Sequence, residues 1–172
     1  MKYKPLLFTI LLVLLVWLQL AVTGGLYLSS GKLNIILAAL VILINLTDFS
    51  WALIFAVAGG LLLDVYSGLP FGVLTLCLFA TAVVVEVLFL NFFTNFSFYS
   101  LLLLGLIAST AYNAMLIAVI AGIYFMGLSD FLPRWDYLPK FLWQVATMEI
   151  IMTAAYFIIN KLSRRFKPMF IN

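Results

Sequence analysis

Six long runs of apolar residues, separated by short polar or charged stretches, constrain this chain more than any other feature. A water-soluble fold of 172 residues could not cover so much hydrocarbon with polar groups, because 67% of the residues are hydrophobic and 9% are charged. The runs lack the alternation, in segments of about ten residues, that is typical of outer-membrane barrels, whereas helices satisfy their backbone hydrogen bonds internally. The sequence therefore predicts an all-α integral membrane protein.

We expect residues 1–172 to form one membrane domain, a polytopic bundle of about six transmembrane helices. The basic start followed by a leucine-rich run would also suit a signal peptide, but no A-x-A-like cleavage site follows, so this run is interpreted as the first span. The second and third runs are shorter than the roughly 20 residues that cross a hydrocarbon core, so they are either tilted short helices or a re-entrant hairpin. The expected spans are approximately residues 6–22, 33–46, 49–64, 71–93, 98–126 and 141–160.

Basic residues gather at the two ends of the chain and indicate its topology. The positive-inside rule places both termini in the cytoplasm, which requires an even number of crossings. The turn from Asp64 to Gly72 and the loop from Asp130 to Lys140 then lie on the outer side. The basic tail would also attract anionic lipid. Six of the nine basic residues carry this signal: Lys2, Lys4, Lys161, Arg164, Arg165 and Lys167.

The residue types that are missing argue against catalysis. The chain has no histidine and one cysteine, Cys77, which lies in an apolar run where a buried thiol is expected. The sequence contains no HExxH motif, no paired aspartate motifs, no Ser/His dyad and no phosphate-binding glycine loop. We therefore expect no enzymatic activity, no catalytic, cofactor-binding or metal site, and no cofactor.

One stretch, from Ala52 to Gly72, combines small residues, a carboxylate and turn-forming residues. Ala52, Ala56, Gly60 and Asp64 recur at every fourth position, so on a helix they form a stripe against which a neighbouring backbone can pack closely. Glycine and proline then favour a chain reversal after Asp64. The turn residues are Ser67, Gly68, Pro70 and Gly72.

The segment Gly59–Gly72, GGLLLDVYSGLPFG, resembles the signature of the rod shape-determining protein MreD family, in which G-x-x-x-D is followed by S-G-x-P-x-G. The resemblance implies a non-enzymatic subunit of the bacterial cell-elongation machinery in the cytoplasmic membrane. The implied partners are an MreC-like single-span protein and, through it, MreB filaments and peptidoglycan synthases, with the lipid bilayer around them and no nucleic acid. Family members are thought to share the six-helix arrangement of the substrate-binding components of energy-coupling-factor transporters. The family motif falls on Gly60, Asp64, Ser67, Gly68, Pro70 and Gly72.

The alternative function is a solute-binding membrane component of a vitamin-type uptake transporter. Such proteins commonly present small residues at A-x-x-x-A spacing on the first helix, where the transporter partner docks. The first run here, LLFTILLVLLVWLQLAV, lacks that spacing, which counts against uptake.

Asp64 lies at the C-terminal end of its expected helix, where the macrodipole disfavours a negative charge. The first interpretation is that its carboxylate accepts hydrogen bonds from backbone N–H groups of Tyr66 to Gly68 and fixes the turn. A direct partner contact and an ion or proton site are the two alternatives.

Three further polar residues lie inside expected spans: Glu86, Asn113 and Glu149. Glu86 is close enough to a helix end for its side chain to reach the interface, whereas Glu149 is not. Asn113 shares a helix face with Gly105 and Ser109, so we expect a packing seam there. The sequence suggests a hydrogen bond between Glu149 and Asn113 that joins the fifth and sixth spans. A pocket for a polar ligand is the competing interpretation.

Overall fold

A computed structural model describes the backbone of residues 4–25, 34–92, 97–126 and 137–166, and the side chains of residues 9–21, 34–92, 97–126 and 141–161. The described backbone forms helices without strands, so the all-α prediction is confirmed. The expected loop around residues 127–136 and most of the basic residues at the chain ends lie outside the described side chains. The helices are α1 (Lys4–Gly25), α2 (Ile35–Leu46), α3 (Phe49–Tyr66), α4 (Val73–Phe92), α5 (Phe98–Phe125) and α6 (Tyr137–Phe166).

Four of these helices are long and apolar enough to cross a membrane. They are α3, α4, α5 and the segment Phe141–Lys161 of α6, which have 18, 20, 28 and 21 residues. The described apolar segment of α1, Thr9–Ala21, is shorter, and α2 has only 12 residues. The structure thus supports a helical membrane protein, with four candidate spans, by length and composition, among the described residues.

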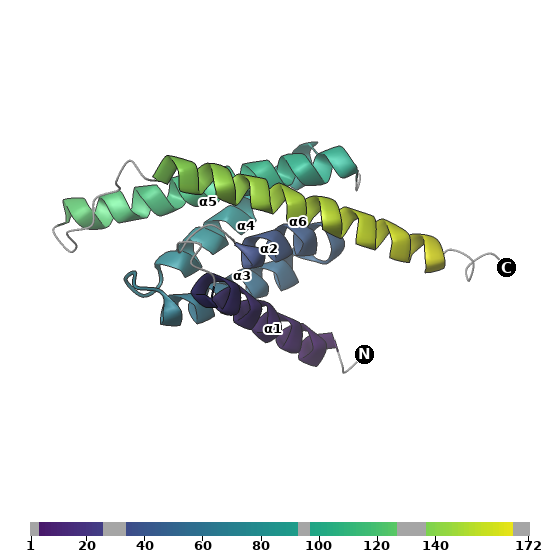
Figure 1. The fold of residues 1–172 in the computed structure, drawn as a ribbon, viewed down its shortest axis with the longest axis horizontal. Helices are drawn as coiled ribbons and strands as arrows, with labels where there is room; N and C mark the ends of the chain where they lie inside the picture. Colours follow the sequence, from purple (N-terminus) through teal and green to yellow (C-terminus); the bar gives the residue numbers. More distant parts are fainter. Residues whose placement is uncertain (1–3, 26–33, 93–96, 127–136, 167–172) are drawn as a thin grey trace.

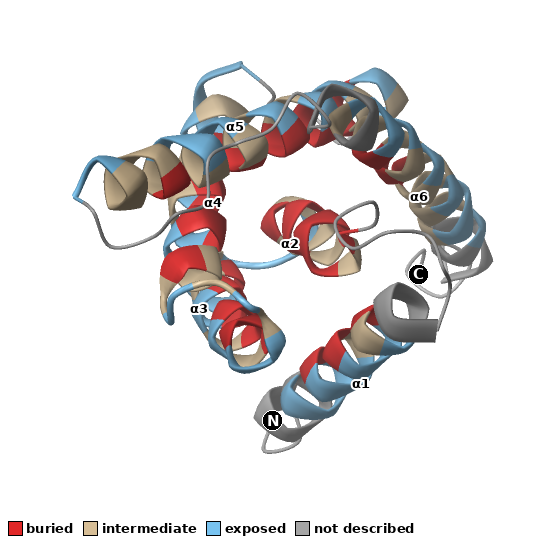
Figure 2. Cartoon of the chain, turned by 60° about the vertical axis from the view of Figure 1, so that its left-hand side comes forward, coloured by how far each residue is buried: buried red, intermediate tan, exposed pale blue. Residues whose placement is uncertain are grey.

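The shortest helix, α2, lies at the centre of the bundle (Figure 2). It contacts each of the other five helices. Ile36, Leu37, Ala38 and Leu40 are all completely buried. A helix of 12 residues is about 18 Å long and could not cross a hydrocarbon core of about 30 Å. Because other helices cover α2, it does not need the length of a helix that faces lipid.

Consecutive helices run in alternating directions, so the start of α1 and the end of α6 lie at the same end of the bundle (Figure 1). The turn between α3 and α4 lies at the opposite end, with the end of α5 and the start of α6. Short connections favour this antiparallel arrangement: only Thr47 and Asp48 separate α2 from α3.

Candidate functional site

The carboxylate of Asp64 joins the end of α3 to the start of α4. Its Oδ1 accepts a hydrogen bond from the Leu74 N–H at 2.9 Å, and its Oδ2 accepts one from the Thr75 N–H at 3.0 Å. The Thr75 hydroxyl donates a third bond to Oδ2 at 2.6 Å. Leu74 and Thr75 are the second and third residues of α4, the positions whose N–H groups an N-cap side chain normally satisfies. Asp64 therefore caps α4 from the neighbouring helix.

The prediction that the Asp64 carboxylate binds N–H groups of its own turn is therefore wrong. The turn N–H groups of Tyr66 to Gly68 were expected to hold the carboxylate, but the start of α4 holds it instead. The physical reason is electrostatic: the N-terminus of α4 carries a positive partial charge, whereas the C-terminus of α3 carries a negative one. Asp64 is only 3% exposed, so this compensation takes place in a buried environment.

Gly60 makes the close approach of α3 and α4 possible. A Cβ at this position would lie 3.0 Å from the Thr75 Oγ1 and only 2.5 Å from the Thr75 Cα, a distance that real Cβ atoms essentially never show. Ala52 and Ala56, earlier in the same stripe, are also fully buried. The expected small-residue stripe is thus a packing face, and its last turn places Asp64 beside Thr75. Sequence reasoning missed Thr75, because Ser, Thr, Asp and Asn are capping signals at the residue just before a helix, whereas Thr75 is the third residue of α4.

The remaining motif residues shape the turn itself. Ser67 ends α3: its N–H and its hydroxyl both donate to the Asp64 carbonyl oxygen, at 3.2 and 3.1 Å. The Pro70 carbonyl oxygen accepts a bond from the Val73 N–H at 3.3 Å. Gly72 has a φ of +95°, a conformation that L side chains rarely adopt, so this position requires glycine. The structure therefore brings the motif together as one structural unit, and a Cβ at Gly68 would meet nothing within 4 Å.

Exposed apolar side chains surround this turn. Val65, Tyr66 and Phe71 are 65%, 68% and 70% exposed, although each is next to or within the turn that Asp64 stabilises. The hydrogen bonds of the turn hold its backbone in one conformation, so these three side chains are presented from a defined support. We call them the turn rim.

The second group of polar residues lies on the seam between α5 and α6. The Asn113 Nδ2 donates to the Ser109 carbonyl oxygen at 2.7 Å and to the Gln144 Oε1 at 3.3 Å. Gly105 faces α6 as well, because a Cβ there would lie 3.2 Å from the Met152 Cγ. The expected packing seam on α5 is therefore confirmed.

The expected hydrogen bond between Asn113 and Glu149 is wrong, because Asn113 binds Gln144 instead. The register of the two antiparallel helices explains the difference. Gly105 lies against Met152, so the position eight residues further along α5, Asn113, meets the position eight residues earlier on α6, Gln144. Sequence reasoning missed Gln144 because hydrophobic spacing reveals a helix face but not its register against a neighbour.

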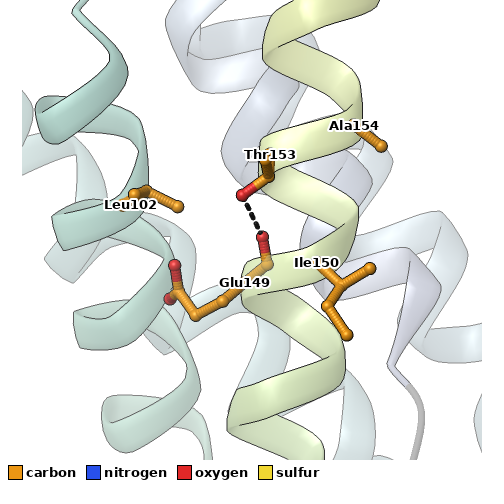
Figure 3. Close-up of a pocket in the computed structure, with 5 residues that line it drawn as sticks. All are labelled: Leu102, Glu149, Ile150, Thr153 and Ala154. Carbon is orange, nitrogen blue, oxygen red and sulfur yellow. Dashed lines mark hydrogen bonds between the residues drawn. The ribbon is translucent and has the colours of Figure 1, made fainter.

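Glu149 and Glu86 are not part of either hydrogen-bonded group. The Glu149 Oε1 is buried and has no hydrogen-bond partner in the described part of the chain. Glu149 lies on the same seam as Asn113 and reaches toward α5 (Figure 3). Glu86 is partly buried on α4, six residues before that helix ends.

The arrangement at Asp64 leaves its two carboxylate oxygens occupied by three hydrogen bonds. A carboxylate held in this way acts as a structural link, because its oxygens already accept from helix N–H groups and a hydroxyl. Within the described part of the chain, no three His, Cys, Asp or Glu residues gather into a group that could hold a metal ion.

Comparisons of this chain with protein-family models, curated proteins and solved structures found no match. The resemblance of Gly59–Gly72 to the MreD signature therefore rests on the motif residues alone. The structural role of these residues in this chain is the capped turn between α3 and α4.

Proposed function

We propose that this chain is a non-enzymatic membrane subunit of the bacterial cell-elongation machinery, similar to MreD. The observation that carries the proposal is the structural role of two motif residues. Gly60 allows α3 and α4 to pack closely, and the Asp64 carboxylate caps the start of α4. These residues hold the turn between α3 and α4 in place. The exposed apolar side chains of the turn rim lie next to it, an arrangement that suits a docking surface. The carboxylate of Asp64 is engaged by three hydrogen bonds at the start of α4, which supports a structural role for the motif.

The proposed partner is an MreC-like protein with a single transmembrane helix, which connects this subunit indirectly to MreB filaments and peptidoglycan synthases. The turn rim, Val65, Tyr66 and Phe71, is the proposed contact surface for it. Exposed aromatic side chains on a fixed support lose little conformational freedom on binding, so they are effective anchors at interfaces.

The proposed location is the bacterial cytoplasmic membrane, with both termini in the cytoplasm. Two observations support this topology: the basic residues gather at the chain ends, and α1 starts at the end of the bundle where α6 finishes (Figure 1). The turn rim then lies on the outer side, where the large extracytoplasmic domain of an MreC-like protein would be accessible.

Co-purification with the MreC-like protein of the same genome tests the proposal. We expect the two chains to remain together in detergent at a fixed ratio, and Tyr66→Ala or Phe71→Ala to reduce the amount of partner recovered. Phe92→Ala is the matched control, because Phe92 is 74% exposed at the other end of α4. Loss of the gene product should also turn rod-shaped cells round.

Mass spectrometry of the purified protein separates this proposal from vitamin uptake. A bound vitamin at a one-to-one ratio, together with no recovery of the MreC-like chain, would replace the scaffold proposal with the uptake alternative.

A further inference from the structure

The five helices around α2 form a ring that is not closed (Figure 2). Along this ring α1 contacts α3, α3 contacts α4, α4 contacts α5, and α5 contacts α6. In the described part of the chain, α1 and α6 do not contact each other, although both contact α2. The ring is therefore open between α1 and α6.

One side of α2 is incompletely covered by the other helices. The residues on this side follow one another at spacings of four, three and four, so they form one stripe along the helix. Three of them are partly exposed and the last, Leu46, is 52% exposed, whereas the buried residues of α2 lie on its other sides. Because helices cover those other sides, the stripe faces the opening between α1 and α6. The stripe consists of Ile35, Ala39, Ile42 and Leu46.

The stripe has the length of one leaflet of a bilayer. Its eleven-residue step from Ile35 to Leu46 corresponds to about 16 Å of helix, and half of a hydrocarbon core is about 15 Å thick. A transmembrane helix of another protein would extend through both leaflets, whereas the acyl chains of a lipid occupy one. All four side chains of the stripe are apolar, so the stripe suits acyl chains.

The start of α1 places a positive charge just beyond the stripe. The Gln19 Oε1 accepts a hydrogen bond from the Ile36 N–H at 3.0 Å, which sets α1 and α2 at the same level there. From that level, Lys4 lies about 22 Å along α1 and Leu46 lies about 15 Å along α2, toward the same end of the bundle. Lys4 is thus about 7 Å beyond the end of the stripe, where a lipid head group would lie.

The end of α6 places more positive charge on the other side of the opening. The Phe98 ring, at the start of α5, packs against the rings of Tyr156 and Phe157 with centroid distances of 5.1 and 6.3 Å. Lys161, an exposed residue four positions after Phe157, therefore lies about 6 Å beyond the start of α5. The helix continues to Phe166 and has arginines three and four positions after Lys161, on the same side of the helix.

We propose that the opening between α1 and α6 binds one anionic phospholipid. Its acyl chains cover the stripe on α2, and its phosphate lies between Lys4 and the basic end of α6. Basic residues close to a membrane surface attract anionic lipids, and Lys4, Lys161, Arg164 and Arg165 outweigh the single negative charge of Asp48 at this end of α2. The inference is independent of the proposed function, because it rests on these helix contacts and charges and not on the motif between α3 and α4.

Native mass spectrometry of the full-length protein in detergent measures the binding. Phosphatidylglycerol and phosphatidylcholine with identical acyl chains are added separately. We expect one phosphatidylglycerol per protein, bound about fivefold or more tightly than phosphatidylcholine. Lys4→Gln and Lys161→Gln should each weaken phosphatidylglycerol binding about threefold to fivefold and leave phosphatidylcholine binding unchanged, which also shows that the variants are folded. Lys140→Gln is the control, because Lys140 lies near the opposite end of α6.

Photolabelling locates the acyl chains. A phosphatidylglycerol with a photoreactive group in one acyl chain is added in trace amount to phosphatidylcholine vesicles that contain the protein. We expect label on Ile42 and Leu46, and we expect Ala39→Phe to reduce this label because the ring fills the space of the acyl chain. Ala114→Phe is the control, because Ala114 is an exposed alanine of α5, away from the opening.

Three results would overturn the proposal. The first is equal affinity for the two lipids, or a preference for phosphatidylglycerol that survives both lysine substitutions. The second is label on the exposed side of α5 with none on α2. The third is a dimer of the wild-type protein that Ala39→Phe abolishes, since a second copy of this chain would then occupy the opening.

Discussion

Asp64 and Thr75 connect α3 to α4 through two hydrogen bonds to the same carboxylate oxygen, one from the Thr75 N–H at 3.0 Å and one from its hydroxyl at 2.6 Å. Helix caps are usually supplied by the residue just before the helix, but that position is occupied by Gly72, which has no side chain. The positive φ of Gly72 makes the turn, and a residue from the preceding helix supplies the cap. Two residues of one motif thus have separate roles: Gly72 makes the turn, and Asp64 caps α4.

Removing the carboxylate should destabilise the protein strongly. Asp64→Ala leaves two N–H groups and one hydroxyl without their acceptor and removes a negative charge from the N-terminus of α4. We expect a loss of about 2–3 kcal/mol in the free energy of unfolding, measured by denaturation in mixed micelles. Asp64→Asn retains one acceptor oxygen and should lose less.

Asp48→Ala is the matched control for this carboxylate. Asp48 is the N-cap residue of α3, but it is exposed and its side chain makes no capping hydrogen bond. The substitution should change the free energy of unfolding by less than about 0.5 kcal/mol. Equal effects of the alanine substitutions at Asp64 and Asp48 would contradict the capping role.

Gly60→Ala should separate α3 from α4. The new Cβ would lie 2.5 Å from the Thr75 Cα, a backbone atom that can move only with its helix. We expect a loss of about 1–3 kcal/mol, as is usual for overpacking, and a weaker cap at Asp64. Gly68→Ala is the control, because a Cβ there meets nothing within 4 Å and should be nearly neutral. A neutral Gly60→Ala with normal thermal unfolding would show that the helices are not in close contact here.

Much of the helical arrangement could be predicted because apolar runs directly mark the parts of a chain that can lie in a membrane. The fifth span was expected at residues 98–126 and α5 occupies Phe98–Phe125, while the second was expected at residues 33–46 and α2 occupies Ile35–Leu46. The sixth was expected at residues 141–160, but α6 extends from Tyr137 to Phe166, because a helix can continue past its apolar segment into polar flanks.

The contacts between helices could not be predicted in the same way. Hydropathy alone does not indicate which helix is central, and the sequence signal for the buried position of α2 is the short length of its apolar run. Spacing placed Asp64 on the correct face, but its hydrogen-bond partners depend on how α4 begins. Asn113 was likewise on the correct seam, and only the helix register distinguishes Gln144 from Glu149 as its partner.

A double-mutant cycle should measure the contact between Asn113 and Gln144. Asn113→Leu and Gln144→Leu remove the two sides of the 3.3 Å hydrogen bond, and we expect a coupling energy of roughly 0.6 kcal/mol, the usual size for such bonds in membranes. The cycle of Asn113→Leu with Glu149→Leu is the control and should be additive. Coupling to Glu149 without coupling to Gln144 would mean that the two helices are shifted relative to each other.

Glu149→Leu should stabilise the isolated protein. The Glu149 Oε1 is buried without a partner in the described part of the chain, so a leucine of similar size removes an unsatisfied polar group and adds apolar contact against α5. We expect a gain of about 1 kcal/mol in the free energy of unfolding, measured by the same micelle denaturation. Glu86→Leu is the comparison, because Glu86 lies near a helix end, where its carboxyl can reach the interface, and its replacement should give a smaller gain. A loss of stability on Glu149→Leu would show that the carboxyl already has a donor within the isolated chain.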